Sequence, residues 1–119
     1  ARELADNEGF EILKKQMIPV ESLQSIIDKH CGGVFPDFLS LDVEGLDELI
    51  LNQIDEQGSC PKIICVESLE YKNDGTGKKK TNLISLMENK GYFVFADTRI
   101  NTILVRNDFW FGDSREPAK

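Results

Sequence analysis

The sequence predicts an α/β fold with a parallel sheet whose last strand runs antiparallel, and three observations lead to this fold class. Short apolar runs alternate with segments of helical periodicity, as in parallel sheets connected by helices. The run Ile63–Val66 is apolar without interruption, which is typical of a strand covered on both faces. The last two strand-like runs, Tyr92–Asp97 and Thr102–Arg106, are joined by a connection too short for a parallel crossover. A chain of 119 residues with 40% hydrophobic residues suits one domain, taken as residues 1–119.

The first third of the chain predicts two strands and a helix. A mixed run over Phe10–Ile18 is expected to form a short strand, and residues 1–9 before it are expected to be poorly ordered. Ser22 is expected to cap a helix that ends at Gly32. The next strand is expected over Asp37–Val43, with successive side chains on opposite faces.

The rest of the chain completes the order β-α-β-α-β-α-β-β. A helix over Leu46–Gln57 leads to a strand over Lys62–Glu67, and a helix over Thr81–Lys90 precedes the two closing strands. The expected apolar stripe of the first of these helices consists of Leu46, Leu49, Ile50 and Ile54. The first three linked units are expected to be right-handed parallel crossovers, and residues 112–119 are expected to be poorly ordered.

Composition argues against several classes of function. The net charge of −7 disfavours a nucleic-acid-binding protein, which needs a basic face. No apolar run approaches the roughly 20 residues of a membrane-spanning helix, and the N-terminus lacks the pattern of a signal peptide. The three cysteines Cys31, Cys60 and Cys65 form no CxxC pair and no even disulfide set, so a reducing cytoplasm is expected.

Acids at the ends of two neighbouring predicted strands are the strongest candidates for chemistry. Ligands of open α/β sheets bind outside the carboxyl ends of the strands, so Asp42, Glu44 and Glu67 are expected to face one crevice. Gly45 would let the backbone approach a ligand closely. The alternative is that Asp42 bonds the next turn while Glu44 or Gly45 caps the following helix. Topology favours function for Asp42, and Glu44 fits either role. A divalent metal is the less favoured occupant, because no His or third clear ligand accompanies the acids.

Other polar residues carry weaker signals. Lys78–Lys80 is expected to be a solvated charge run rather than a carboxylate or phosphate site. His30 is expected to be a helix-end residue rather than a catalyst, and Glu70 has no assignable role. Asn101 either faces the crevice or occupies the hairpin turn, and the turn is the safer interpretation.

The stretch from Pro36 to Trp110 resembles the C-terminal half of FkbM-type methyltransferases, which are S-adenosylmethionine-dependent enzymes with the Rossmann-like class I fold. The most specific feature is Asp37–Gly45, which looks like the family's hydrophobic strand ending in Asp-x-Glu-Gly. Three further features support the resemblance. Pro61–Glu67 looks like the family's next strand, which ends in Glu, and Val20–Leu23 is similar to the segment that precedes its fourth-strand region. The closing hairpin of the family is similar to Gly91–Tyr92, Ala96–Thr98 and Asn101–Arg106.

The resemblance implies that these strands are the fourth to seventh of a seven-stranded sheet, so that the chain is a partial α/β domain. Asp42 would lie near the methionine part of the cofactor and the acceptor, and Glu44 and Glu67 would line the same crevice. The family's glycine-rich loop and ribose-binding acid belong upstream of this chain. The isolated chain is therefore expected to bind S-adenosylmethionine weakly or not at all.

The leading hypothesis is the C-terminal part of a methyltransferase that methylates an oxygen nucleophile of a small-molecule or glycan-like acceptor. The catalytic residues would be Asp42, which orients the acceptor or cofactor or acts as a general base, and Glu67, which assists by hydrogen bonding or metal coordination. Asp42, Glu44 and Gly45 would bind the cofactor. The alternative is a non-catalytic α/β interaction module without a cofactor site, and a glycosidase that uses Asp42 and Glu44 is a distant third.

The strand Phe38–Val43 would have an unpaired edge in such a partial sheet. An apolar edge with free N–H and C=O groups attracts another strand. We expect either Phe10–Ile18 or a second copy of the chain to cover it, and the second option makes a homodimer.

Overall fold

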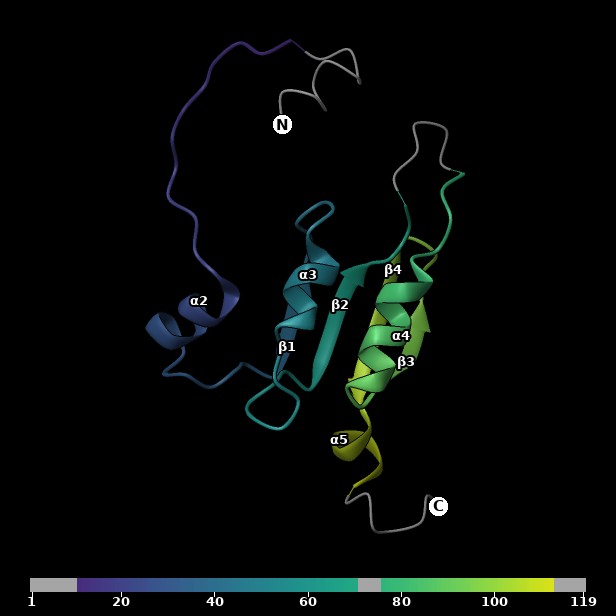
Figure 1. Ribbon diagram of the computed structural model, residues 1–119. Helices are drawn as coiled ribbons and strands as arrows, with labels where there is room; N and C mark the ends of the chain where they lie inside the picture. The colour runs from purple at the N-terminus through teal and green to yellow at the C-terminus, as the bar shows by residue number, and fades with distance from the viewer. Residues whose placement is uncertain (1–10, 71–75, 113–119) are drawn as a thin grey trace.

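The computed structural model describes residues 11–70 and 76–112, which form a four-stranded sheet with helices (Figure 1). In chain order the elements are α2 (Leu23–His30), β1 (Phe38–Leu41), α3 (Asp47–Asn52), β2 (Ile63–Glu67), α4 (Thr81–Asn89), β3 (Tyr92–Asp97), β4 (Asn101–Arg106) and α5 (Asn107–Phe111). The expectations for residues 1–9 and for 113–119 lie outside the described residues.

The sheet is mixed, with the strand order β1-β2-β4-β3. β1 and β2 are parallel, whereas β4 lies between β2 and β3 and is antiparallel to both. The predicted antiparallel last strand is therefore confirmed. Figure 1 shows α3 in front of the sheet as it connects β1 to β2, which is a right-handed crossover. The connection from β2 through α4 to β3 is a second such crossover, because β2 and β3 are both antiparallel to β4, which lies between them, and α4 covers the same face as α3. The expectation of three crossovers is wrong for the first one, because residues 11–20 form no strand before β1.

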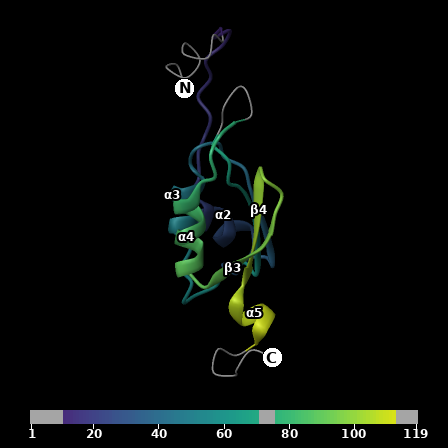
Figure 2. The same cartoon turned by 90° about the vertical axis from the view of Figure 1, so that its right-hand side faces the viewer.

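The core lies between the sheet and the two helices α3 and α4, which cover the same face (Figure 2). The fully buried side chains of this layer include Leu51, Ile64, Leu83, Met87 and Leu104. In β2 the burial alternates, since Ile64 and Val66 are buried while their neighbours are half-buried. The expectation that both faces of this strand are covered is therefore confirmed in full on the face of the helices and only in part on the opposite face.

The other face of the sheet is covered in part by aromatic side chains from the end of the chain. Phe93 packs against Trp110 and Phe111 with ring centroids 6.3 and 5.2 Å apart. Phe95 contacts Trp110 in the same way at 5.2 Å. The three aromatics of α5 remain about half exposed. Phe38 at the free edge of this face is 55% exposed.

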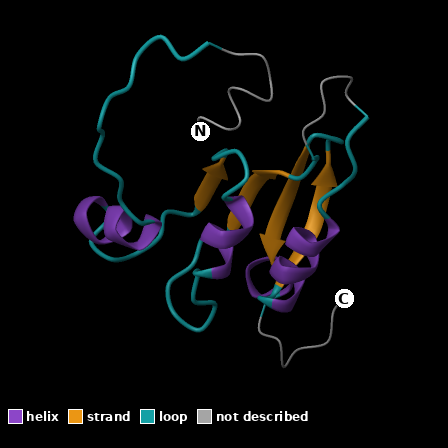
Figure 3. Ribbon diagram, turned by 45° about the horizontal axis from the view of Figure 1, so that its top comes forward, coloured by secondary structure: helices purple, strands orange, loops and turns teal. Residues whose placement is uncertain are grey.

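Two predicted elements differ from the structure. Residues 11–20 form no strand and are exposed, and Figure 3 shows them as an extended loop that lies away from the sheet. The strand expected over Phe10–Ile18 is therefore wrong for its described residues, and Phe10 itself is outside them. This segment also leaves the edge of β1 uncovered.

The helix expected over Leu46–Gln57 is shorter, and its buried stripe is different. α3 ends at Asn52. Ile50 and Ile54 pack into the core as expected, but Leu46 and Leu49 are exposed, and Asp47 and Leu51 are buried instead. A turn follows the helix, in which Asp55 Oδ1 accepts a hydrogen bond from the N–H of Gln57 at 3.0 Å. Lys90 also donates its ammonium to the carbonyl of Ile54 at 2.6 Å.

Candidate functional site

The carboxyl ends of β1 and β2 bring two predicted site residues together. Leu41 is in register with Val66, so Asp42 and Glu67 follow at the same level of two adjacent parallel strands. The expectation that these strands are neighbours is confirmed. Side chains alternate across a sheet, so Asp42 and Glu67 lie on the face opposite α3 and α4.

The electrostatics of Glu67 also place these acids close together. Partial burial raises the pKa of Glu67, and the charge of Asp42 and hydrogen bonding with it raise the pKa further. The Lys80 ammonium lowers the pKa of Glu67, and the more distant Glu44 carboxylate raises it. Three acids and one lysine therefore share this end of the sheet, which we call the acidic edge: Asp42, Glu44, Glu67 and Lys80.

The turn after β1 has a strained backbone that exposes its acids. Glu44 and Gly45 have positive φ angles of 36° and 94°, and a side chain at the second position would be strained. Leu46 is the N-cap residue of α3, and its side chain makes no capping hydrogen bond. Instead Asp47, which is 2% exposed, accepts a hydrogen bond from the N–H of Val43 at 3.4 Å. The interpretation in which Glu44 or Gly45 caps the helix is therefore wrong.

A third strand contributes Asn101 to the same edge. Asn101 begins β4 and pairs directly with Glu67 in the antiparallel register. Side chains of directly opposed residues share a face, so Asn101 stands beside Glu67. Its backbone is fixed by Thr98, whose hydroxyl accepts from the Asn101 N–H at 3.1 Å. Asn101 thus both closes the hairpin turn and reaches the edge, although the sequence favoured the turn alone.

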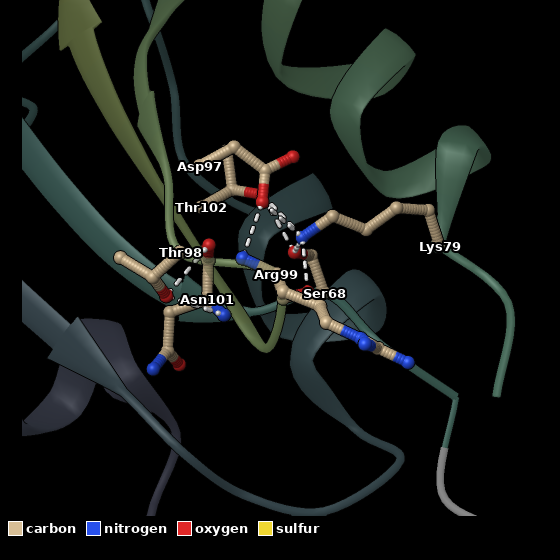
Figure 4. A network of polar contacts seen from close by, with 7 residues as sticks. All are labelled: Ser68, Lys79, Asp97, Thr98, Arg99, Asn101 and Thr102. Atoms are coloured by element: carbon tan, nitrogen blue, oxygen red, sulfur yellow. Dashed lines mark hydrogen bonds and ion pairs between the residues drawn. The ribbon is translucent and has the colours of Figure 1, made fainter. Parts of the chain in front are cut away.

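The lysine run is not uniformly solvated. Lys78 is exposed, but the Lys79 ammonium bonds Ser68 Oγ at 2.7 Å and Asp97 Oδ1 at 2.8 Å (Figure 4). Lys80 is half-buried, and its N–H donates to the Ser68 carbonyl at 2.6 Å. The expectation of a solvated run is wrong for these two residues, and no feature of the sequence distinguishes them from Lys78.

The remaining candidates lie elsewhere. His30 lies in the last turn of α2, which confirms it as a helix-end residue. Glu70 is exposed beyond the end of β2. Within residues 11–70 and 76–112, no three His, Cys, Asp or Glu side chains are grouped so that they could hold a metal ion. In the same ranges no helix has the length and apolar character needed to cross a membrane.

Two hollows border the sheet. One of about 450 Å³ lies between α3 and α4 and reaches Gly45 and Glu48. The larger, about 680 Å³, lies at the amino end of the parallel strands around Cys60, Lys62 and Arg106. Its cations are already paired, since Arg106 binds Asp108 at 3.0 Å. We therefore place the candidate site at the acidic edge rather than in the larger hollow.

The chain matches a known family over most of its length. The model of the methyltransferase FkbM domain matches residues 3–94, which include β1, β2, α4 and the acidic turn Asp42–Gly45. The match ends within β3, so β4 and its Asn101 lie beyond it. Neither the curated proteins nor the solved structures contain a significant match to the chain. The match covers more than half of the chain, and this protein belongs to the FkbM methyltransferase domain family.

Proposed function

We propose that this chain forms the acceptor side of an S-adenosylmethionine-dependent methyltransferase that methylates a hydroxyl oxygen on a small-molecule or glycan-like acceptor. The observation that carries the proposal is the acidic edge of an FkbM-family chain, where Asp42 and Glu67 end adjacent parallel strands. Ligands of open α/β sheets bind at this position. We further propose that the chain is the C-terminal half of a class I methyltransferase sheet.

The residues of the acidic edge fit the cofactor chemically. S-adenosylmethionine carries a positive sulfonium and an ammonium group, and the carboxylates of Asp42, Glu44 and Glu67 supply complementary negative charge. A Cβ placed on Gly45 would meet no atom within 4 Å, so the turn is open to a neighbouring group. When bound, the cofactor supplies the methyl group that the acceptor oxygen takes.

The two catalytic candidates suit different tasks. Asp42 is exposed and would orient the acceptor hydroxyl or the cofactor ammonium by accepting hydrogen bonds. The pKa of Glu67 is raised above that of an ordinary carboxyl, which makes Glu67 the better proton acceptor. Glu67 would therefore remove the hydroxyl proton while Asp42 holds the oxygen in place. The Lys80 ammonium would limit the rise in the pKa of Glu67.

A methyl-transfer assay of the native polypeptide that contains this sequence tests the proposal. The assay would use S-adenosylmethionine labelled in the methyl group and a panel of sugars and polyols. Asp42→Asn should lower transfer by about 100-fold, the size of the loss expected when a reacting group is misplaced. Asp37→Asn is the matched control, because Asp37 is an exposed acid at the opposite end of the same strand. Equal activity of the Asp42 variant and the control would contradict the assignment.

The second candidate function is an interaction module without a cofactor site. It is favoured by the described residues, in which no strand leads directly into a glycine-rich loop. Under this alternative the native polypeptide would transfer no methyl group and would bind no S-adenosylmethionine in equilibrium dialysis.

The cysteines support a reducing compartment, and we propose the cytoplasm. Cys31, Cys60 and Cys65 are all free thiols. Structural disulfides are rare where glutathione keeps thiols reduced. Labelling of the three thiols in a cell lysate prepared under acid quench would test this placement.

A further inference from the structure

Lys79 joins three segments that are far apart in the sequence. Its ammonium donates to Ser68 Oγ at 2.7 Å, just after β2, and to the carbonyl of Arg99 at 2.6 Å in the β3–β4 turn. It also forms an ion pair with Asp97 at 2.8 Å, and Figure 4 shows these partners around the one ammonium. All three segments meet at the carboxyl end of β2.

The partners of Lys79 are themselves fixed. The hydroxyls of Ser68 and Thr102 are fully buried and bond each other at 2.6 Å. Asp97 accepts a second hydrogen bond, from the N–H of Arg99 at 2.7 Å. Arg99 has a positive φ of 78°, so the turn holds a conformation that a non-glycine residue rarely adopts without support. The lysine thus anchors a strained turn to a rigid buried pair.

The segment 76–80 runs back along the end of β2. Leu69 and Lys79 form an isolated antiparallel bridge, with bonds from the Glu70 N–H to the Lys78 carbonyl at 2.8 Å and from the Lys80 N–H to the Ser68 carbonyl at 2.6 Å. This pairing is too short to be stable by itself. The Lys79 side chain bonds both Ser68, just after β2, and the β3–β4 turn.

These anchored segments carry the neighbours of Glu67. Lys80 follows Lys79 directly, and Asn101, which is paired with Glu67, follows the turn that Lys79 holds. The charged groups that act on Glu67 are Asp42 and Glu44 from the turn after β1, and Lys80 from the start of α4.

We propose that Lys79 is a positioning residue of the acidic edge, which clamps segment 76–80 and the β3–β4 turn onto the end of β2 and thereby holds Lys80 and Asn101 beside Glu67. The proposal deepens the proposed function, because the acidic edge is the site named there. It assigns Lys79 no contact with cofactor or acceptor.

The test is the pKa of Glu67, measured by carbon-13 NMR of its carboxyl group during a pH titration of the full chain without any ligand. Lys80→Gln should raise the pKa of Glu67 by roughly 0.5, the size of one screened charge pair. Lys79→Met should raise it by a similar amount, because Lys80 is released. Lys78→Met is the matched control, since Lys78 is the exposed neighbour, and it should leave the value unchanged.

The double variant Lys79→Met with Lys80→Gln separates the two ways in which Lys79 could act. If Lys79 positions Lys80, the double variant should match Lys80→Gln alone, whereas additive shifts would show that Lys79 acts by its own charge and would overturn the proposal. An unchanged pKa in a folded Lys79→Met chain would also overturn it. Lys79→Arg keeps the cation and its donors and should restore the wild-type pKa in part. Because no cofactor is present, the result does not depend on whether methyl transfer is the function.

Faster amide exchange provides a second measurement that does not depend on titration. In Lys79→Met the N–H groups of Glu70 and Lys80 should exchange at least several-fold faster, while those of β2 should be unaffected. If the amides of Glu70 and Lys80 exchange at the wild-type rate in Lys79→Met, segment 76–80 needs no clamp and the proposal fails.

Discussion

The buried hydroxyl pair between β2 and β4 allows a prediction of size and sign. Ser68 and Thr102 are both fully buried, and their oxygens are 2.6 Å apart. After Thr102→Val, Ser68 still has the Lys79 ammonium at 2.7 Å, so the expected loss of stability is about 1 kcal/mol, one net hydrogen bond. After Ser68→Ala, Thr102 is left with Lys79 at 3.5 Å, too far for a good bond, and the expected loss is about 2 kcal/mol.

The double variant is the informative one. Once Ser68 is alanine, the hydroxyl of Thr102 is buried with no adequate partner, so its removal should be neutral or stabilising. The effect of Thr102→Val on the free energy of unfolding should therefore vanish or change sign when Ser68 is replaced by alanine, which is a coupling of about 1 kcal/mol or more. Urea unfolding followed by far-ultraviolet circular dichroism at pH 7 measures all four chains, with the exposed Ser40→Ala as a control. Equal losses from Thr102→Val in both backgrounds would refute the bonded pair.

Three further predictions concern the fold, the charge of the edge and its assembly. Tyr92→Phe removes the hydroxyl that donates to the buried Pro61 carbonyl and should lower the free energy of unfolding by about 1.5 kcal/mol. Calorimetry should show a decrease in Tm of roughly 6 °C. An unchanged Tm would mean that water replaces the bond. The raised pKa of Glu67 contributes stability that is present below the unfolded pKa of 4.5 and is lost as the pH rises through the folded pKa. Glu67→Gln should therefore be more stable than wild type at pH 7 and lose this advantage below pH 4.5. A Glu67→Gln variant that is less stable than wild type at pH 7 would contradict the sign of this effect. The free edge of β1 should pair with a second copy, and light scattering should give a dimer; a monomer would rule out this assembly.

The sequence identified the sheet well because its signals are local. The alternation of strand-like runs with helical segments and the short connection between β3 and β4 can be recognised without knowledge of the tertiary structure. That Asp42 and Glu67 lie at the same edge of the sheet followed from the rule that ligands bind at the carboxyl ends of parallel strands, and the register of β1 and β2 confirmed this position.

The errors have tertiary causes. A mixed run such as Phe10–Ile18 forms a strand only beside a partner, and its described residues lie away from the sheet although the edge of β1 is free. α3 ends early because Lys90, 36 residues away, binds the carbonyl of Ile54. The distinct roles of Lys79 and Lys80 depend on bonds to Ser68 and to the β3–β4 turn, which no spacing within the lysine run encodes.

The central claim is that the acidic edge is the ligand-binding site of this family member, and NMR on the nitrogen-15-labelled chain tests it most directly. S-adenosylmethionine is titrated to millimolar concentration, since this chain alone is expected to bind it weakly or not at all. The claim predicts shift changes at the amides of Asp42, Glu44, Gly45 and Glu67, which Asp42→Asn should reduce and Asp37→Asn should not. Shift changes confined to the opposite end of the sheet, at Cys60, Lys62 and Arg106, would contradict it.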